Sequence, residues 1–491
     1  MPGYRKSASY KFQIYILHVT HNDYQMSLTE ILEEFNDVFW YIPLVLIVCL
    51  GIYSTIRLKG IQIRDVKEMF RVTFSKDRKS ENTLSTIQVF CMSMGNRIGV
   101  GNITGPVLAI LVGGPGAILW MWIFAALGMA TSFVETTVGQ IYKGRRSDGD
   151  YHGGPAYTIA NGLGMKGLAM VVAVIMMLMY VVGFVSMEVC GMSEALCGAF
   201  EFEHNALFFA ILLTALTAVI IAGGLKRIAK LSVFLVPLMA LMWFIVAIGS
   251  IALSGSGIIN AFAMIFGYAF TIPAAIGGVV GDMIVIGMRR GVLSNEAGIG
   301  TITNISSIAD VSHPAKQGLS QSLGVLIDTI ISTITALVIL SYADIDTILD
   351  MGLESMPLLQ MILADSFGSI APYLVALFLF IFAFTSLMGD YVIGENNLMF
   401  AKDSKVSRYV MVVIILVTVF ISSFYASDGM FAIVDILLGV CGVINTIVMF
   451  KLGGRAIEAY NDYRRQRSEG IEDPVFHKSA LSCQDGITEW D

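Results

Sequence analysis

Long apolar segments separated by short polar connections dominate the pattern of this 491-residue chain. A helix needs about 20 residues to cross the roughly 30 Å of hydrocarbon in a bilayer. Eleven segments meet this criterion, and they run approximately over 39–57, 86–112, 116–142, 167–198, 206–224, 228–254, 257–288, 320–344, 370–400, 408–425 and 429–450. The pattern predicts an all-α polytopic membrane protein with 11 transmembrane helices.

Two of these segments contain residues that interrupt a helix. The stretch from Gly95 to Gly105 holds four glycines, two asparagines and Arg97, and a second stretch from Thr271 to Gly278 holds Pro273. An unpaired peptide group in hydrocarbon costs several kcal/mol, roughly 2 to 7. Broken helices therefore persist at membrane depth only where the freed groups face protein or a water-filled cavity, which is typical of a transporter binding site.

The composition supports a membrane protein and excludes several other classes. The chain is 56% hydrophobic and 14% charged, with a mean hydropathy of +0.73. Its six cysteines form no CxxC pair, so we propose no disulfide framework, zinc site or other cofactor. All six histidines lie outside the apolar segments, which argues against an imidazole proton relay. We find no phosphate-binding loop or nucleotide fold, so we expect neither ATP nor nucleic acid as a partner.

The first residues carry signals of their own. Residues 1–25 are polar and lack the apolar run of a cleavable signal peptide. The sequence Ser27-Leu28-Thr29-Glu30 is a capping-box pattern that predicts a short amphipathic helix, and translation from Met26 is an alternative to translation from Met1.

Basic residues alternate between connections. Of the 31 lysines and arginines, 27 lie on alternate connections, at the segment ends that border them or in the C-terminal tail, three lie in the N-terminal leader, and Arg97 alone lies deep inside a segment. The connections after segments one, three, five, seven and nine are therefore predicted to be cytoplasmic, together with the C-terminal tail. This places the N-terminus outside, in a multi-pass protein of the plasma (cell inner) membrane.

The two broken segments each begin a block of five. Because five is odd, the second block enters the membrane in the opposite orientation to the first, which predicts an inverted repeat. The expected divisions are 1–38 (leader and amphipathic helix), 39–85 (extra transmembrane helix and basic loop), 86–256 (first repeat), 257–451 (second repeat) and 452–491 (tail).

A set of motifs in fixed order resembles one known family. The motifs are Gly99-Val100-Gly101-Asn102-Ile103-Thr104-Gly105, Gly113-Gly114-Pro115-Gly116-Ala117, Trp120-Met121-Trp122, Gly128-Met129-Ala130-Thr131, Gly153-Gly154-Pro155, Gly223-Gly224-Leu225-Lys226-Arg227-Ile228, Ser294-Asn295-Glu296-Ala297-Gly298-Ile299-Gly300, His313-Pro314 with Gln317-Gly318-Leu319, and Gly324-Val325-Leu326-Ile327-Asp328-Thr329. Over roughly residues 35 to 460 the chain is similar to the alanine or glycine:cation symporters, the sodium:alanine symporter family. The resemblance implies a LeuT-type 5+5 inverted repeat after one extra helix, and Na⁺-coupled uptake of small neutral amino acids.

The first break has chemistry suited to this function. Gly99 and Gly101 free the backbone and let a ligand approach closely. A half-helix starting near Ile103 would present free N–H groups to a substrate carboxylate, and Asn102 can donate and accept. By similarity to LeuT-type proteins, carbonyl groups of Gly95 and Ile98 are expected to bind Na⁺, for which hard oxygen ligands are suitable.

Further ligands are expected from segment nine. Thr385 and Ser386 are adjacent hydroxyls in an apolar helix, at positions where family members place sodium and substrate contacts. The alternative is that each hydroxyl bonds back to the carbonyl four residues earlier.

The chain departs from the family pattern at the substrate pocket. Val100 replaces a usual threonine, Glu188 a glutamine, Cys190 an asparagine and Asp390 a tryptophan that covers the pocket. Gly191 and Met192 follow Glu188 and complete the substrate-binding set that the resemblance implies. Asp390 shares a helix face with Ser386, because the two are four residues apart.

Ionisable residues inside a membrane are functional candidates that need a partner. An ion pair between Arg97 and Glu188 is one account of Glu188. Asp390 and Asp282 are then left without a cation, and they could be protonated, bind a second ion, bind a substrate amine or line water. The added carboxylates favour substrates with an extra amine or amide over plain alanine.

The leading hypothesis is a secondary symporter that couples inward Na⁺ movement to the uptake of a small amino acid. The first alternative is a transporter of the same fold that is coupled to protons or takes a polar or basic amine. The second is a non-transporting membrane receptor or channel. No catalytic chemistry is implied.

Overall fold

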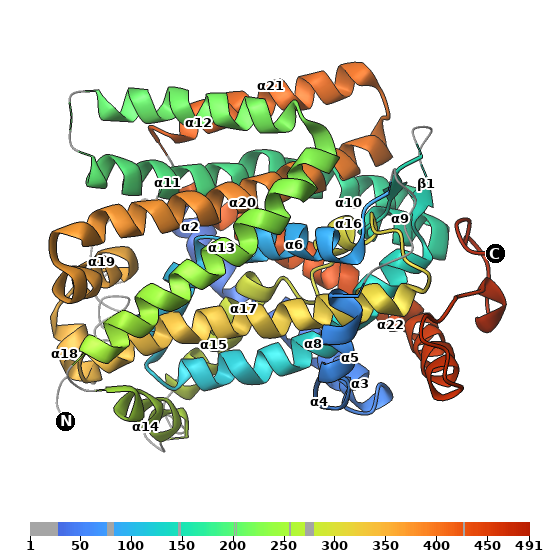
Figure 1. The fold of residues 1–491 in the computed structure, drawn as a ribbon, viewed down its shortest axis with the longest axis horizontal. Helices are drawn as coiled ribbons and strands as arrows, with labels where there is room; N and C mark the ends of the chain where they lie inside the picture. The colour runs from blue at the N-terminus through green and yellow to red at the C-terminus, as the bar shows by residue number, and fades with distance from the viewer. Residues whose placement is uncertain are drawn as a thin grey trace.

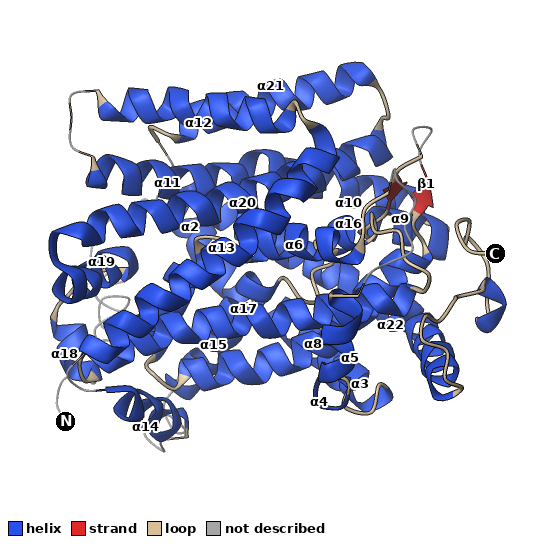
Figure 2. Ribbon diagram, viewed as in Figure 1, coloured by secondary structure: helices blue, strands red, loops and turns tan. Residues whose placement is uncertain are grey.

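The protein is almost entirely helical. The computed structural model describes residues 28–75, 83–145, 149–200, 202, 204–254, 257–270, 279–425 and 428–491. Within them, the strands are β1 (Gly144–Arg145) and β2 (Tyr151–His152), an antiparallel pair in which Gly144 lies opposite His152 (Figure 2). Eight long helical stretches are apolar enough to cross a membrane, and three apolar helices are shorter. The prediction of an all-α polytopic membrane protein is confirmed.

The elements follow one another as shown in Figure 1. Up to residue 253 the helices are α2 (Leu28–Phe39), α3 (Tyr41–Arg57), α4 (Ile61–Arg64), α5 (Val66–Thr73), α6 (Thr86–Arg97), α7 (Gly101–Gly113), α8 (Ala117–Ile141), α9 (Pro155–Tyr157), the π-helix η1 (Thr158–Gly162), α10 (Lys166–Leu178), the π-helix η2 (Met179–Phe184), α11 (Val185–Ala199), α12 (Asn205–Ile221) and α13 (Gly224–Leu253). Later helices are α14 (Gly257–Ala269), α15 (Val279–Asn295), α16 (Thr303–Ser306), α17 (Pro314–Tyr342), α18 (Ile345–Asp350), α19 (Ser355–Phe367), the 3₁₀-helix η4 (Gly368–Ile370), α20 (Ala371–Ala401), α21 (Lys405–Ser422), α22 (Asp428–Ser468) and the 3₁₀-helix η5 (Lys478–Ala480).

Each predicted apolar segment contains a helix, but several boundaries differ. The amphipathic helix predicted near the N-terminus is confirmed as α2, whereas its capping residue Ser27, the alternative start Met26 and residues 1–25 lie outside the described residues. Helix α22 continues 18 residues beyond position 450, to Ser468. Helices α18 and α19 were not predicted.

The two ends of the bundle can be told apart by α22. Its 41 residues span about 60 Å at 1.5 Å per residue, so its first and last turns lie at opposite ends of the molecule. Residues 469–491, the tail segment, follow the last turn and fold back on the bundle. We call the end of the bundle that this segment covers the tail end. Helices α14, α18 and α19 lie at the opposite end (Figure 1).

The placement of Arg289 corrects the topology drawn from basic residues. The predicted segments 257–288 and 320–344 place Arg289 and Lys316 on one connection, which is expected to be cytoplasmic. In the structure Arg289 pairs with Asp37 of α2 at 2.7 Å and with Asp435, near the start of α22, at 2.8 Å, whereas Lys316 pairs with Asp473 of the tail segment at 2.5 Å. The assignment of Arg289 is wrong because α15 continues to Asn295, and the chain reaches the tail end only with the following residues up to Pro314.

The core of the bundle is formed by helices that are buried all round. In α8 the residues from Gly128 to Ile141 are buried without interruption, and so are Pro314–Val325 of α17 and Phe382–Gly394 of α20. A helix without an exposed face belongs to the centre of a bundle. Helix α6 packs against α17 and α20 and is buried from Val89 to Arg97, which places the first break in the centre.

Candidate binding site at the broken helix

The predicted first break is present. Helix α6 ends at Arg97, Ile98 has a non-helical backbone (φ −85°, ψ 83°), and α7 begins at Gly101. Tight turns close the interruption, with hydrogen bonds from Asn102 N to Gly99 O (3.2 Å) and from Ile103 N to Val100 O (3.0 Å). The half-helix therefore begins two residues before the predicted start near Ile103.

A second interruption faces the first. After α15, Glu296, Gly298 and Gly300 all have positive φ angles of 51°, 92° and 89°, so the chain cannot continue as a helix. We call residues 296–302 the second interruption. Sequence reasoning noted these residues only as a motif and expected a break from Thr271 to Gly278. That stretch and the side chain of Asp282 lie outside the described residues, so their part in the site stays a prediction.

Arg97 connects the two interruptions. Its guanidinium donates to Asn295 O (3.1 Å), to the backbone oxygen and Oε1 of Gln321 (both 3.2 Å) and to Ser132 Oγ (3.2 Å). All four acceptors are neutral. The account of Glu188 as an ion-pair partner of Arg97 is therefore wrong.

Three carboxyl groups nevertheless lie within electrostatic range of the guanidinium. They belong to Glu135, Glu296 and Asp328. Sequence reasoning missed Glu135 and Asp328 as site residues. The rule that selected Asp390, an acidic residue inside an apolar segment, would have found both.

Helix α20 supplies one wall of the first break. A Cβ added to Gly95 would lie 3.3 Å from Thr385 Cβ, so the two residues are in direct contact. Ser386 Oγ donates to Asn96 O at 3.3 Å, whereas Thr385 Oγ1 donates to Phe382 O of its own helix at 2.9 Å. The Thr385 hydroxyl therefore bonds within its own helix, close to the alternative considered above, but its acceptor is the carbonyl three residues earlier instead of four. Ile98 is fully buried at the break itself.

Two acidic side chains lie against the break. Glu188 Oε1 would be 2.6 Å from a Cβ on Gly99, and its carboxyl group also approaches the Ser386 hydroxyl and the backbone of Val100. Asp390 Oδ1 accepts a hydrogen bond from Asn96 Nδ2 at 2.9 Å. The two carboxyl groups are within electrostatic range of each other.

The remaining predicted substrate residues divide into two groups. A Cβ on Gly191 would lie 3.3 Å from Val100 Cγ2, and Met192 is fully buried. Gly101 is exposed, and a Cβ there would meet no atom within 4 Å. The side chain of Asn102 points away from the break.

The Asn102 amide belongs to a separate polar cluster. Its Nδ2 lies 2.5 Å from Asp328 Oδ1, 3.2 Å from Ser294 Oγ and 3.1 Å from Ser332 Oγ. A cavity of about 10 Å³ adjoins these side chains. The structure therefore brings together Gly95, Ile98, Thr385, Ser386, Glu188 and Asp390 around the break, and directs the Asn102 side chain away from them.

Comparison with known proteins covers almost the whole chain. The model of the sodium:alanine symporter family matches residues 25–478. The amino-acid carrier protein AlsT of Bacillus subtilis is 38% identical over 93% of this chain and 96% of its own length. The probable sodium/glutamine symporter GlnT of the same organism is 38% identical over 95% and 97%, and the sodium/alanine symporter AgcS of Methanococcus maripaludis is 31% identical over 90% and 100%.

Proposed function

The chain belongs to the sodium:alanine symporter family, and from this premise we propose that it couples inward Na⁺ movement to the uptake of a small amino acid by alternating access. Alanine, glycine or a polar relative is the expected substrate. The observation that carries the proposal is the contact between the broken helix and α20, where Gly95 touches Thr385 and Ser386 donates to Asn96 O. No catalytic step is involved, and Na⁺ is the coupling ion instead of a resident cofactor.

The architecture that fits this function is a LeuT-type fold with eleven transmembrane helices. The first repeat would comprise residues 86–256 and the second residues 257–451, after the extra helix in 39–85. Two facing interruptions near the centre of the bundle support this arrangement, since transporters of this kind bind at the repeat interface. The N-terminus would lie outside the plasma membrane, and the tail end, where most basic residues gather, would lie in the cytoplasm.

The sodium site is proposed at the junction of α6 and α20. Carbonyl oxygens of Gly95 and Ile98 and hydroxyl oxygens of Thr385 and Ser386 would be its ligands. These are hard oxygen donors of the kind that cations of groups 1 and 2 prefer. The close contact of Gly95 with Thr385 supports the proposal because it brings the backbone of α6 next to the Thr385 side chain, where a Cβ on residue 95 would fit only tightly.

The substrate site is proposed next to the sodium site, on the other side of the break. Its residues would be Val100, Gly101, Glu188, Gly191, Met192, Ser386 and Asp390, together with the backbone of Asn102, whose side chain lies in the separate cluster with Asp328. Free N–H groups at the start of α7 can hold an anionic group. Because Ser386 belongs to both sets, Na⁺ and the amino acid would stabilise each other's binding through one hydroxyl and one backbone break, and rocking of one repeat against the other would then release both to the cytoplasm.

Uptake into proteoliposomes tests the proposal. The purified protein would be reconstituted, and labelled alanine, glycine and glutamine would be offered with an inward Na⁺ gradient, an inward H⁺ gradient or neither. We expect concentrative uptake only with the Na⁺ gradient. Failure of a Na⁺ gradient to concentrate any of these amino acids would refute sodium symport.

A second candidate function is a transporter of the same fold that is coupled to protons or takes a polar or basic amine. The observation that favours it is the pair of buried acids, Glu188 and Asp390, at the break. Uptake driven by the H⁺ gradient alone would support it.

A further inference from the structure

The wall formed by α6, α11 and α20 next to the break is unusually rich in hydrogen-bond acceptors. Asn96, Glu188 and Asp390 are only 5%, 7% and 0% exposed. Each has one side-chain oxygen without a hydrogen-bond partner among the described residues: Asn96 Oδ1, Glu188 Oε2 and Asp390 Oδ2. A buried polar atom left unpaired costs about 1 to 3 kcal/mol, and more when it is charged.

All three unpaired atoms are acceptors, which identifies what is missing. Protein interiors that keep an ionised carboxylate buried provide it with a cation or several donors. The basic side chain of the break, Arg97, cannot serve, because its donors are directed to Asn295, Gln321 and Ser132. Within the described part of the chain, neither Glu188 nor Asp390 pairs with a basic side chain.

The position of Glu188 adds a second argument. Its carboxyl group approaches the backbone of Val100, where the N–H groups of the half-helix α7 begin. This is the place where a helix attracts a negative group. Since Glu188 lies against the backbone of Val100, a ligand carboxylate is repelled from this wall and would be held on the Gly101 side of the turn, whereas a positive group is attracted to the wall.

We propose that Asn96, Glu188 and Asp390 form a binding site for one compact cationic group, which enters the bundle with the substrate. The group is either a second ammonium group, on the side chain of the substrate, or a monovalent metal cation bound beside the substrate. The inference deepens the proposed function, on which it rests, because it specifies the charge of what the central site accepts. It separates this chain from a site that binds only one Na⁺ and a neutral amino acid.

Two carboxyl-to-amide variants test the proposal in proteoliposomes that take up labelled alanine. Glu188→Gln and Asp390→Asn keep size and shape but remove the negative charge. The matched control is Glu395→Gln, which lies on the same helix α20 and pairs with Arg408 at 3.1 Å. Two quantities are measured for each protein: inhibition by 2,3-diaminopropionate relative to glutamine, and the charge moved per alanine.

The two sources of the cation give different results. If the substrate supplies an ammonium group, both amide variants raise the half-inhibitory concentration of 2,3-diaminopropionate by about tenfold or more, with little change for glutamine. If a metal cation binds, the inhibition pattern is unchanged and the charge moved per alanine falls by about one elementary charge. Either result supports the site. Variants that match wild type in both measurements would overturn it, and would mean that both carboxyl groups stay neutral.

A binding measurement separates this inference from the proposed function. The detergent-solubilised protein would be heated with 2,3-diaminopropionate, alanine or NaCl, and its unfolding temperature recorded. Stabilisation by the diamine or by Na⁺ that Asp390→Asn abolishes and Glu395→Gln keeps supports the site even if the wild-type protein transports nothing. Equal stabilisation of all three proteins contradicts the site even if Na⁺-driven uptake is observed.

Discussion

Gly324 of α17 leaves open the space that Arg97 Nη1 occupies, and a Cβ at position 324 would collide with that atom. The guanidinium can therefore pass between α6 and α17 to reach Gln321, one turn earlier on α17. A glycine in an apolar helix and an arginine at a break are thus two parts of one arrangement.

Replacing Gly324 with alanine should disturb the first break from a distance. The added methyl group forces the guanidinium away from its acceptors, and overpacking of this kind costs about 1 to 3 kcal/mol. We expect a lower unfolding temperature in detergent and slower uptake. The control is Gly454→Ala on α22, where a Cβ meets nothing within 4 Å and the protein should be unchanged or slightly more stable. Equal behaviour of the two variants would contradict the collision.

Substitutions of Arg97 itself should separate the effect of its charge on folding from the effect of its hydrogen-bond geometry on transport. Arg97→Gln leaves the carboxyl groups of Glu135, Glu296 and Asp328 without a nearby cation, and breaking a buried charge arrangement costs about 3 to 5 kcal/mol. Arg97→Lys keeps the charge but cannot reach four acceptors with a single ammonium group. We expect Arg97→Lys to fold and to transport poorly, and Arg97→Gln to be poorly folded. Size-exclusion profiles and uptake rates measure the two effects, and wild-type uptake by Arg97→Gln would disprove the role of the charge.

Much of the helical architecture can be predicted from the sequence because a bilayer imposes a minimum length on every apolar segment. The first break was also predictable, because the glycines and polar residues from Gly95 to Gly105 interrupt an apolar segment that is long enough to cross the bilayer. The second interruption could not be predicted, because residues 296–302 follow an amphiphilic stretch whose pattern is typical of a connection between membrane segments. The depth of the second interruption in the membrane depends on where α15 starts, which the sequence pattern leaves open. For the same reason Arg289 was placed on the wrong side of the bundle.

The site was predictable only as far as single positions. An acidic residue in an apolar helix can be recognised from the sequence. Its partner cannot, because the partner depends on how the helices are rotated against one another. Arg97 and Glu188 have opposite charges, yet the guanidinium turns toward α8, α15 and α17, while Glu188 faces Gly99. Packing around Gly324 and Gly99 decides these directions, and packing of that kind leaves no periodic signal in a single sequence.

The two hydroxyls on α20 should differ in their effect on sodium dependence. Ser386 bonds across to Asn96 O, whereas Thr385 bonds within its own helix. We expect Ser386→Ala to raise the Na⁺ concentration for half-maximal alanine uptake by about tenfold, and Thr385→Ala to raise it less, because the loss of a ligand to a charged group costs about 1.5 to 3 kcal/mol. Sodium titrations of uptake measure both, and an unchanged Na⁺ requirement in the two variants would remove α20 from the sodium site.

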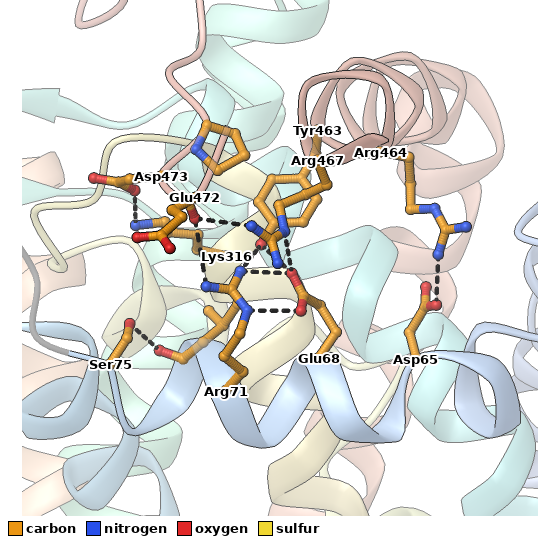
Figure 3. A network of polar contacts seen from close by, with 12 residues as sticks. Asp65, Glu68, Arg71, Ser75, Lys316, Tyr463, Arg464, Arg467, Glu472 and Asp473 are labelled. Atoms are coloured by element: carbon orange, nitrogen blue, oxygen red, sulfur yellow. Dashed lines mark hydrogen bonds and ion pairs between the residues drawn. The ribbon is translucent and has the colours of Figure 1, made fainter. Parts of the chain in front are cut away.

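Glu68 should make the tail end sensitive to acid. Burial alone would raise the pKa of its carboxyl group, but hydrogen bonds from Arg71 and Tyr463 and the charge of Arg467 lower the pKa from 4.5 to about 2 (Figure 3). A carboxyl group whose pKa is lowered by folding stabilises the protein above its ordinary pKa, and this stabilisation is lost as the pH falls toward the lowered value.

The difference in unfolding temperature between wild type and Glu68→Gln should therefore be constant near pH 7 and shrink from about pH 4.5 downward. Thermal unfolding in detergent at a series of pH values measures it. Glu469→Gln, whose carboxylate is 51% exposed and lies 3.5 Å from Arg465, is the control and should differ little from wild type at any pH. A difference for Glu68→Gln that does not depend on pH would mean that its charge contributes nothing.

Trp490 should hold the tail segment against the bundle. Its side chain is 7% exposed, its Nε1 donates to Gln140 O at 2.9 Å, and its ring packs on Phe476 (5.3 Å between ring centres) and under Lys143 Nζ (4.8 Å). Removing a buried tryptophan side chain costs about 3 to 5 kcal/mol. We expect Trp490→Ala to release the tail segment to protease, whereas Val475→Ala, at a 48% exposed position, should leave it protected.

The release should also reach the start of the broken helix. Phe476 N donates to Ser312 O, and Asp310 N, two residues earlier, donates to Leu84 O just before α6. Amide hydrogen exchange in Trp490→Ala is therefore expected to rise both at 309–313 and at 83–88, because a segment that loses its buried contacts opens more often. Exchange that rises in the tail alone would show that α6 is anchored independently of it, and would confine the role of the tail segment to covering the end of α22.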